Sequence, residues 1–213
     1  AVEGLIYSPN QCKDESTEAV AAEISNIKRD RSNYIGTAVG LWPESAAATL
    51  DAKVKEVEET YSATMTAEER KAQAAALQTA WADFVASLAN VEINQPVSGN
   101  FYRMYTPLRA SRYATGNGAD AAITGPTEAN TKASIWQFVS RGDNSYDIIN
   151  LADGTYITTS GDPLKCVTDR PSAGWTLKPA ENAGHVIVVS GSAQFNQQNH
   201  SSYHLLNWGS GTN

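Results

Sequence analysis

The sequence predicts an α+β protein of two domains, an N-terminal antiparallel three-helix bundle (residues 1–95) followed by an all-β domain (residues 98–213). Before about Val97, Ala, Glu and Lys recur at the spacing of amphipathic helices. After it, short aromatic and β-branched runs alternate with Gly, Asn, Asp and Ser turns. These runs recur about every 40 residues, which favours a pseudo-threefold β fold over an α/β enzyme.

Three helical stretches are expected before residue 91. The first covers about 16–34, the second begins at Pro43, and the third begins at Thr66, whose hydroxyl can form a capping box with Glu69. Each has a narrow apolar stripe, so the helices are stable only when they bury one another. The stripes are Val20, Ile24, Ile27 and Tyr34; then Leu50, Val54, Val57 and Tyr61; then Leu77, Trp81, Phe84, Val85 and Leu88.

Two short motifs carry a resemblance in this segment. Gly40-Leu41-Trp42-Pro43 leads into the second helix, and Thr66-Ala67-Glu68-Glu69 leads into an Ala-rich third helix. Between residues 5 and 91 the chain resembles the FIVAR module, a three-helix unit of large bacterial surface and secreted proteins. The resemblance implies a spacer or accessory-binding role and no chemistry. The apolar side chains of the loop at 35–42 are expected to pack under the bundle.

The β domain is divided into three units by its opening strands, at about 101–105, 146–150 and 185–189. A tryptophan closes each of the first two units, Trp136 and Trp175. The same count from Val186 passes beyond Asn213, so the third unit is expected to lack its closing strand and the chain to be part of a longer polypeptide. The residues expected in the core are Trp136, Phe138, Tyr146, Ile148, Trp175, Leu177, Ile187 and Val189.

From Ser98 onward this pattern resembles the ricin-B-type β-trefoil. The tight turn of Asp153-Gly154-Thr155-Tyr156-Ile157 matches the entry to the second strand of that family. The resemblance implies three four-stranded units, each able to hold one shallow sugar site. Neither Trp136 nor Trp175 stands in a Gln-x-Trp signature, so binding is expected in the third unit rather than in the first two.

The third unit contains the best cluster for a sugar. A pyranose packs its C–H face on an indole, and its hydroxyls take planar amide partners. Trp208 is therefore the expected platform, flanked by polar side chains, and the alternative is a half-buried tryptophan beside a solvated turn. The candidate ligand-binding residues are Trp208, Asn207, Gln197, Asn199 and Tyr203.

Other chemistries find little support. His200 and His204 lie four apart without helical amphipathicity or a nearby carboxylate, so no metal is expected. Arg141-Gly142-Asp143 spells an adhesion tripeptide where a turn between units is needed. Cys12 and Cys166 match no redox spacing, and whether they pair stays open. No catalytic constellation or cofactor motif is present.

The net charge of -7 argues against nucleic acid or an anionic membrane as the main partner, and no apolar run approaches the ~20 residues of a membrane-spanning helix. Two function classes remain. The first, which the resemblances favour, is a monomeric, non-catalytic glycan-binding module of a larger secreted or surface bacterial protein, a glycoside hydrolase. The second is a structural spacer or protein-interaction module whose trefoil has lost sugar binding.

Overall fold

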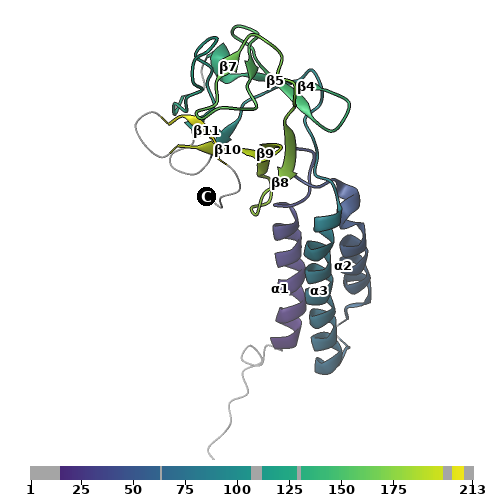
Figure 1. Cartoon of the computed structure of the whole chain (residues 1–213). Coiled ribbons are helices and arrows are strands. Elements are labelled where there is room, and N and C mark those ends of the chain that lie inside the picture. The colour runs from purple at the N-terminus through teal and green to yellow at the C-terminus, as the bar shows by residue number, and fades with distance from the viewer. Residues whose placement is uncertain (1–14, 63, 107–111, 129–130, 199–202, 209–213) are drawn as a thin grey trace, which may run out of the picture. The chain divides into compact units, whose positions relative to one another are not determined.

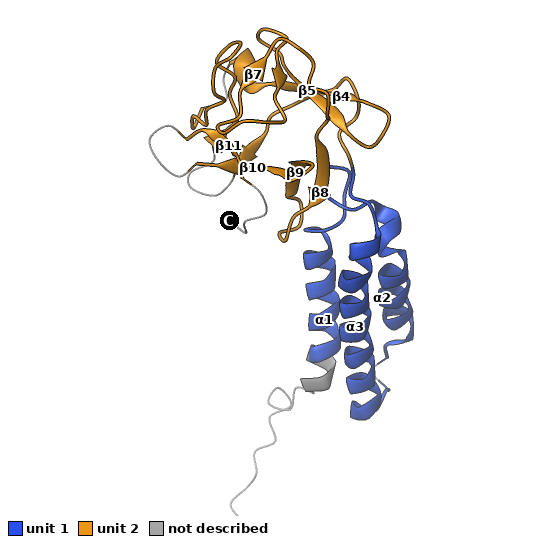
Figure 2. Cartoon of the chain, in the orientation of Figure 1, with its two compact units in different colours: residues 1–94 blue, residues 95–213 orange. Residues whose placement is uncertain are grey.

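The computed structural model describes residues 15–62, 64–106, 112–128, 131–198 and 203–208 (Figure 1). Backbone contacts divide the chain into two compact units, Ala1–Asn94 and Gln95–Asn213 (Figure 2). The N-terminal of these two compact units is helical. Beyond Asn90 the described residues contain strands and a single three-residue 3-10 helix, η3 (Lys132–Ser134). This confirms the predicted α+β fold class.

The helical unit is an antiparallel three-helix bundle. Followed by the chain colours of Figure 1, the chain runs upward in α1, downward in α2 and upward again in α3. Helix α3 packs against both other helices. The predicted capping box is present, because Thr66 Oγ1 accepts from Glu69 N and the Glu69 carboxylate accepts from Thr66 N. The helices are α1 (Glu15–Arg31), η1 (Glu44–Ala47), α2 (Ala48–Thr60), α3 (Ala67–Ser87) and η2 (Leu88–Asn90).

Two details of the predicted stripes were wrong. Val85 is exposed, because it follows the buried Phe84 and successive residues of a helix point about 100° apart. The first helix ends at Arg31, so Tyr34 lies in the following turn, where its ring packs edge-on against Trp81 and Phe84. The stripe residues that are buried are Val20, Ile27, Leu50, Val54, Val57, Leu77, Phe84 and Leu88.

The loop between α1 and α2 is held by Trp42, which is buried as predicted. Its indole Nε1 donates to the carbonyl oxygens of Leu88 and Val91, both at 3.1 Å. These carbonyls follow the end of α3, where main-chain acceptors lose their helical partners. Trp42 therefore supplies a hydrogen-bond donor to carbonyl oxygens at the C-terminal end of α3, and its buried ring packs at the same end of the bundle.

The β unit is built from short antiparallel strands in three sheets of described residues, ordered β1-β4-β5-β6-β7, β11-β10-β9-β8 and β2-β3. The bounds of the first seven are β1 (Phe101–Tyr102), β2 (Tyr105–Thr106), β3 (Arg112–Tyr113), β4 (Trp136–Ser140), β5 (Tyr146–Asn150), β6 (Tyr156–Ile157) and β7 (Cys166–Val167). The last four are β8 (Thr176–Pro179), β9 (Val186–Ser190), β10 (Ala193–Gln197) and β11 (Leu205–Asn207).

Three backbone hydrogen bonds close a ring at the centre of this unit. Ile123 N donates to Leu164 O at 3.0 Å, Leu164 N to Leu205 O at 2.8 Å, and Leu205 N to Ile123 O at 2.9 Å. Both steps are 41 residues long (123 to 164, 164 to 205), and all three side chains are buried. Three equally spaced residues joined by a closed ring of bonds surround a pseudo-threefold axis that relates three repeats of the chain. This arrangement makes the β unit a β-trefoil.

The closing tryptophans obey the same symmetry. Trp136 Nε1 donates to Ala114 O at 2.8 Å, and Trp175 Nε1 donates to Ile157 O at 3.4 Å. Each tryptophan also lies opposite the tyrosine that opens its own unit, Trp136 opposite Tyr102 and Trp175 opposite Tyr146. Both indoles are fully buried, which confirms their predicted place in the core.

The predicted inward face of β9 was wrong by one residue. Val188 is buried and pairs with the buried Leu177, whereas Ile187 and Val189 are half-exposed. Side chains alternate between the faces of a strand, so a one-residue shift exchanges the two sets. The prediction of a missing closing strand falls on residues 209–213, which lie outside the described residues.

Candidate functional site

The threefold axis identifies equivalent positions in the three units. In each unit a residue three places after the axis residue lies opposite a residue of the preceding strand. These pairs are Pro126 with Tyr113, Val167 with Tyr156, and Trp208 with Gln194. The position is proline, valine and tryptophan in turn, so an aromatic platform exists there only in the third unit.

Trp208 presents its indole to solvent, with 48% of the residue exposed. Its Nε1 donates to Asp162 Oδ2 at 3.2 Å, and its carbonyl oxygen accepts from Asn196 Nδ2 at 3.2 Å. Asp162 is exposed and belongs to the loop between β6 and β7 of the second unit. An indole face beside a carboxylate joins an apolar surface to a strong hydrogen-bond acceptor.

The structure distributes the sequence-predicted residues unevenly. The Gln197 side-chain amide donates to the carbonyl oxygens of Tyr203 and, at 3.3 Å, His204, so it is engaged inside the third unit. The Tyr203 ring is covered by the Arg112 guanidinium at 3.5 Å from the ring centroid, which joins the third unit to the first. Asn199 lies outside the described residues.

Asn207 is half-buried at the end of β11 and pairs with Phe195, whose ring contacts the buried Trp175. Neighbouring residues of a strand project to opposite faces, so Asn207 and Trp208 belong to different faces of this hairpin. The structure thus brings no side chain of the predicted set into a shared cluster with Trp208 among the described residues, and sugar binding by this set stays a prediction.

The residues that do accompany Trp208 were missed from the sequence. Gln194 lies opposite it, and Asn196 follows on the same strand face, as residues two apart on a strand do. Alternation along β10 could have identified both of them. Asp162 carried no such signal, because it is 46 residues away from Trp208 in the sequence and belongs to a different repeat of the trefoil.

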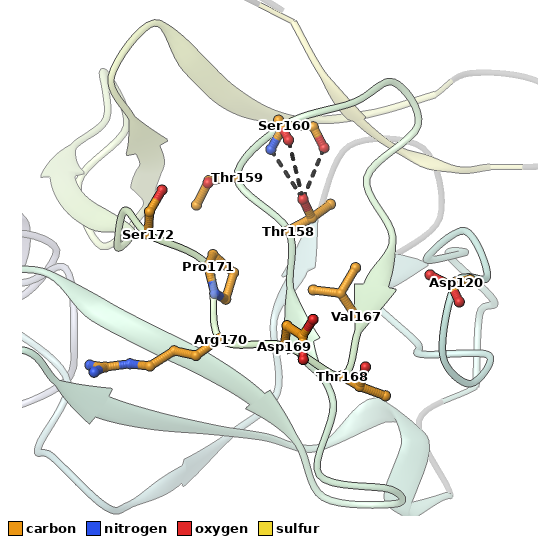
Figure 3. A pocket seen from close by; sticks show the side chains of 10 residues that line it. All are labelled: Asp120, Thr158, Thr159, Ser160, Val167, Thr168, Asp169, Arg170, Pro171 and Ser172. Atoms are coloured by element: carbon orange, nitrogen blue, oxygen red, sulfur yellow. Dashed lines mark hydrogen bonds between the residues drawn. The ribbon is translucent and has the colours of Figure 1, made fainter.

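In the second unit the equivalent position, Val167, borders a hollow of about 330 Å³ (Figure 3). Hydroxyl groups dominate its lining, and Thr158 Oγ1 donates to Ser160 O at 3.1 Å. Arg170 extends away from the other labelled side chains in Figure 3, toward Asp147, which it contacts at 2.7 Å. The hollow offers hydroxyls for hydrogen bonding but no aromatic platform.

Several chemistries can be compared with the described residues. They include no group of three His, Cys, Asp or Glu side chains placed to hold a metal ion, and His200 of the predicted histidine pair lies outside them. Cys166 is buried, and this burial raises the pKa of its thiol; Cys12 lies outside the described residues. None of the described helices is long and apolar enough to cross a membrane.

No family model and no curated protein matches the sequence. Among solved structures, the chain is similar to a ricin B-like lectin of Macrolepiota procera in complex with lactose, at 18% identity and a TM-score of 0.48, covering 55% of this chain and 91% of the lectin. It is also similar to the designed threefold-symmetric protein ThreeFoil, at 12% identity and a TM-score of 0.45, covering 53% of this chain and 91% of that one.

A third similar structure is a mosquitocidal holotoxin, at 12% identity and a TM-score of 0.48, covering 58% of this chain and 18% of the toxin. All three likenesses fall below a TM-score of 0.5. The trefoil assignment therefore rests on the chain's own ring of backbone bonds, and the site on its own geometry.

Proposed function

We propose that the β unit is a non-catalytic carbohydrate-binding module whose site lies on the exposed face of Trp208. The observation that supports this most is the pairing of a half-exposed indole with the Asp162 carboxylate at 3.2 Å. Two such groups offer a sugar both an apolar surface and a hydroxyl acceptor. The hydrogen bond from Nε1 also fixes the orientation of the ring before a ligand arrives, which lowers the entropy cost of binding.

The proposed site takes a neutral pyranose in the orientation that the indole dictates. The C–H face of the ring packs on Trp208, and hydroxyls at the ring edge donate to the free oxygen of Asp162. Gln194 lies opposite Trp208 and supplies an amide on the same face of the hairpin. Of the residues predicted from sequence, Trp208 carries the proposed site, Gln197 donates to the carbonyl oxygens of Tyr203 and His204, and Asn207 belongs to the other face of the hairpin.

Affinity should be weak, in the ~mM to µM range typical of few contacts on an open surface. Binding of a neutral sugar should also change little with salt, because no ion pair between protein and ligand carries it. A module this weak gains from neighbouring modules that raise the effective concentration.

The wider context is proposed on the motifs. The helical unit resembles a FIVAR spacer, and Trp42 of its Gly40-Leu41-Trp42-Pro43 motif packs at the end of α3 with two hydrogen bonds. A helical spacer that precedes a sugar-binding trefoil in the chain suits an accessory segment of a secreted or surface bacterial protein. We place it with a glycoside hydrolase, as a monomeric module joined to further domains of that chain.

Titration calorimetry of the purified chain against neutral plant and host oligosaccharides tests the proposal. Trp208→Ala should abolish binding with the fold retained. Phe101→Ala is the matched control, because Phe101 is a similarly exposed aromatic of the same unit, at 52%. Binding that survives Trp208→Ala, or that Phe101→Ala removes equally, would refute the site. Absence of binding to any sugar would favour the alternative, a structural or protein-interaction module.

A further inference from the structure

A second polar hollow, of about 510 Å³, lies in the β unit between the β4–β5 turn, the segment before β8 and the β9–β10 turn. It has no lining residue in common with the surroundings of Trp208 described above. Its polar lining includes two arginines, one carboxylate and three serines: Arg141, Arg170, Asp143, Ser145, Ser172 and Ser190. The hollow therefore combines strong donors with hydroxyls, a mixture that ordinary apolar pockets lack.

The two arginines share one buried carboxylate unequally. Arg170 Nε donates to Asp147 Oδ2 at 2.7 Å, its Nη2 lies 2.7 Å from the same oxygen as an ion pair, and Asp147 is only 5% exposed. Arg141 lies 3.6 Å from the other oxygen through Nη1, while its Nη2 donates to Pro171 O at 3.0 Å. Arg141 Nη1 is buried and has no hydrogen-bond partner among the described residues. Arg141 therefore lies inside the wall of the hollow with Asp147 as its counter-ion, whereas the Arg170 side chain is 54% exposed and can be reached by a ligand.

The backbone around the hollow keeps the Arg141 stem in place. A Cβ at Gly174 would lie 2.6 Å from Arg141 Cδ and 2.4 Å from Ser145 Oγ, so a side chain there would displace both residues. Asp143 also lines the hollow, and its Oδ1 accepts from Ser145 N and from Ser145 Oγ, so its second oxygen takes no part in these two bonds. The Arg141 side chain is only 14% exposed, so it is not presented to solvent as an Arg141-Gly142-Asp143 adhesion motif would require.

We propose that this hollow binds a sugar residue carrying a carboxylate, a uronic or sialic acid. The exposed Arg170 guanidinium donates to the planar carboxylate of the ligand through N–H groups that Asp147 does not occupy, and its planar geometry suits that contact. The serine hydroxyls and the second oxygen of Asp143 bind the ring hydroxyls. The inference goes beyond the proposed function, because it adds a charged site that uses neither Trp208 nor Asp162.

Calorimetry with a pair of ligands that differ at one carbon tests this site directly. Methyl β-glucuronide carries a carboxylate where methyl β-glucoside carries CH₂OH, and methyl sialoside is the second acidic probe. At least one acidic probe should bind, the glucoside should bind at least about tenfold more weakly at this site, and affinity for the acid should fall with salt.

Two substitutions separate binding from structure. Arg170→Lys keeps a cation beside Asp147 but loses the planar guanidinium, so acid affinity should fall about tenfold while the fold is retained. Asp143→Asn removes a like charge and should tighten acid binding about threefold. Its matched control is Asp153→Asn, because Asp153 Oδ1 accepts from Thr155 N and Oγ1 in an equivalent turn away from the hollow.

The contradicting results are distinct from those of the Trp208 site. Equal binding of glucuronide and glucoside in the Trp208→Ala variant, or binding of neither acidic probe, would overturn the carboxylate assignment. An identical response to Asp143→Asn and Asp153→Asn would overturn the location. Trp208→Ala should leave acid binding unchanged, so loss of neutral-sugar binding and loss of acid binding can be told apart.

Discussion

Replacing Leu164 with Ala should destabilise the β unit by about 3–4 kcal/mol. The Leu164 side chain is 0% exposed and its main chain takes part in two of the three bonds around the threefold axis. The change removes three carbon groups, worth about 0.8 kcal/mol each, or about 2.4 kcal/mol in transfer energy. The cavity left at a site that cannot collapse adds roughly 1 kcal/mol or more. The main-chain bonds themselves remain.

Urea unfolding followed by tryptophan fluorescence measures this loss as a lower midpoint with an unchanged m-value. Leu151→Ala is the matched control, because Leu151 belongs to the same unit but is 38% exposed, and it should cost less than about 1 kcal/mol. Leu164→Val, a milder change, keeps the test readable if the alanine variant fails to fold. A loss at Leu164 no larger than at Leu151 would refute the central packing of the axis.

Two further predictions concern ionisable groups. The pKa of Glu69 lies below its usual value, chiefly because its carboxylate accepts a hydrogen bond from the Thr66 backbone N–H. A group whose pKa is lower when folded stabilises above its unfolded pKa of about 4.3 and loses that contribution as pH falls through the folded value. The helical unit should thus lose stability in acid by denaturant titration from pH 7 to 3, and less steeply in Glu69→Gln; identical slopes would contradict this. Cys166 is buried with a raised pKa, so in a Cys12→Ser variant its thiol should react with a disulfide reagent at pH 8 only after unfolding, and fast reaction of the native protein would contradict its placement.

The fold could be predicted well because its signals are local or repeated. The capping box at Thr66 lies within four residues of chain, and the closing tryptophans repeat with their opening tyrosines. The ring of Ile123, Leu164 and Leu205 could not be foreseen as a contact, although its spacing of 41 residues (123 to 164, 164 to 205) is present in the sequence. The inward face of β9 was wrong because its run of Val and Ile is apolar on both faces, so alternation carries no information there.

The candidate site could be predicted only in part. Trp208 was singled out because an indole flanked by Asn and Gln residues occurs in the third unit, and its role in binding stays a prediction. The sequence did not reveal that the Gln197 amide donates to Tyr203 O, because a Gln/Asn run does not show which amides are used by their own turn. Asp162 and the Arg141–Asp147–Arg170 network depend on contacts between distant segments, which residue spacing alone does not encode.

The central claim, that neutral sugar binds on the face of Trp208, is tested most directly by the indole N–H signals of the chain in a ¹H–¹⁵N correlation spectrum. The sequence contains five tryptophans, so five indole signals are expected, and Trp208→Phe assigns the one of interest. Titration with a neutral oligosaccharide should shift the Trp208 signal, whose Nε1 bonds to Asp162, while the buried Trp136 and Trp175 signals stay fixed. A bound sugar that leaves the Trp208 signal unmoved, or shifts all five alike, would contradict the account.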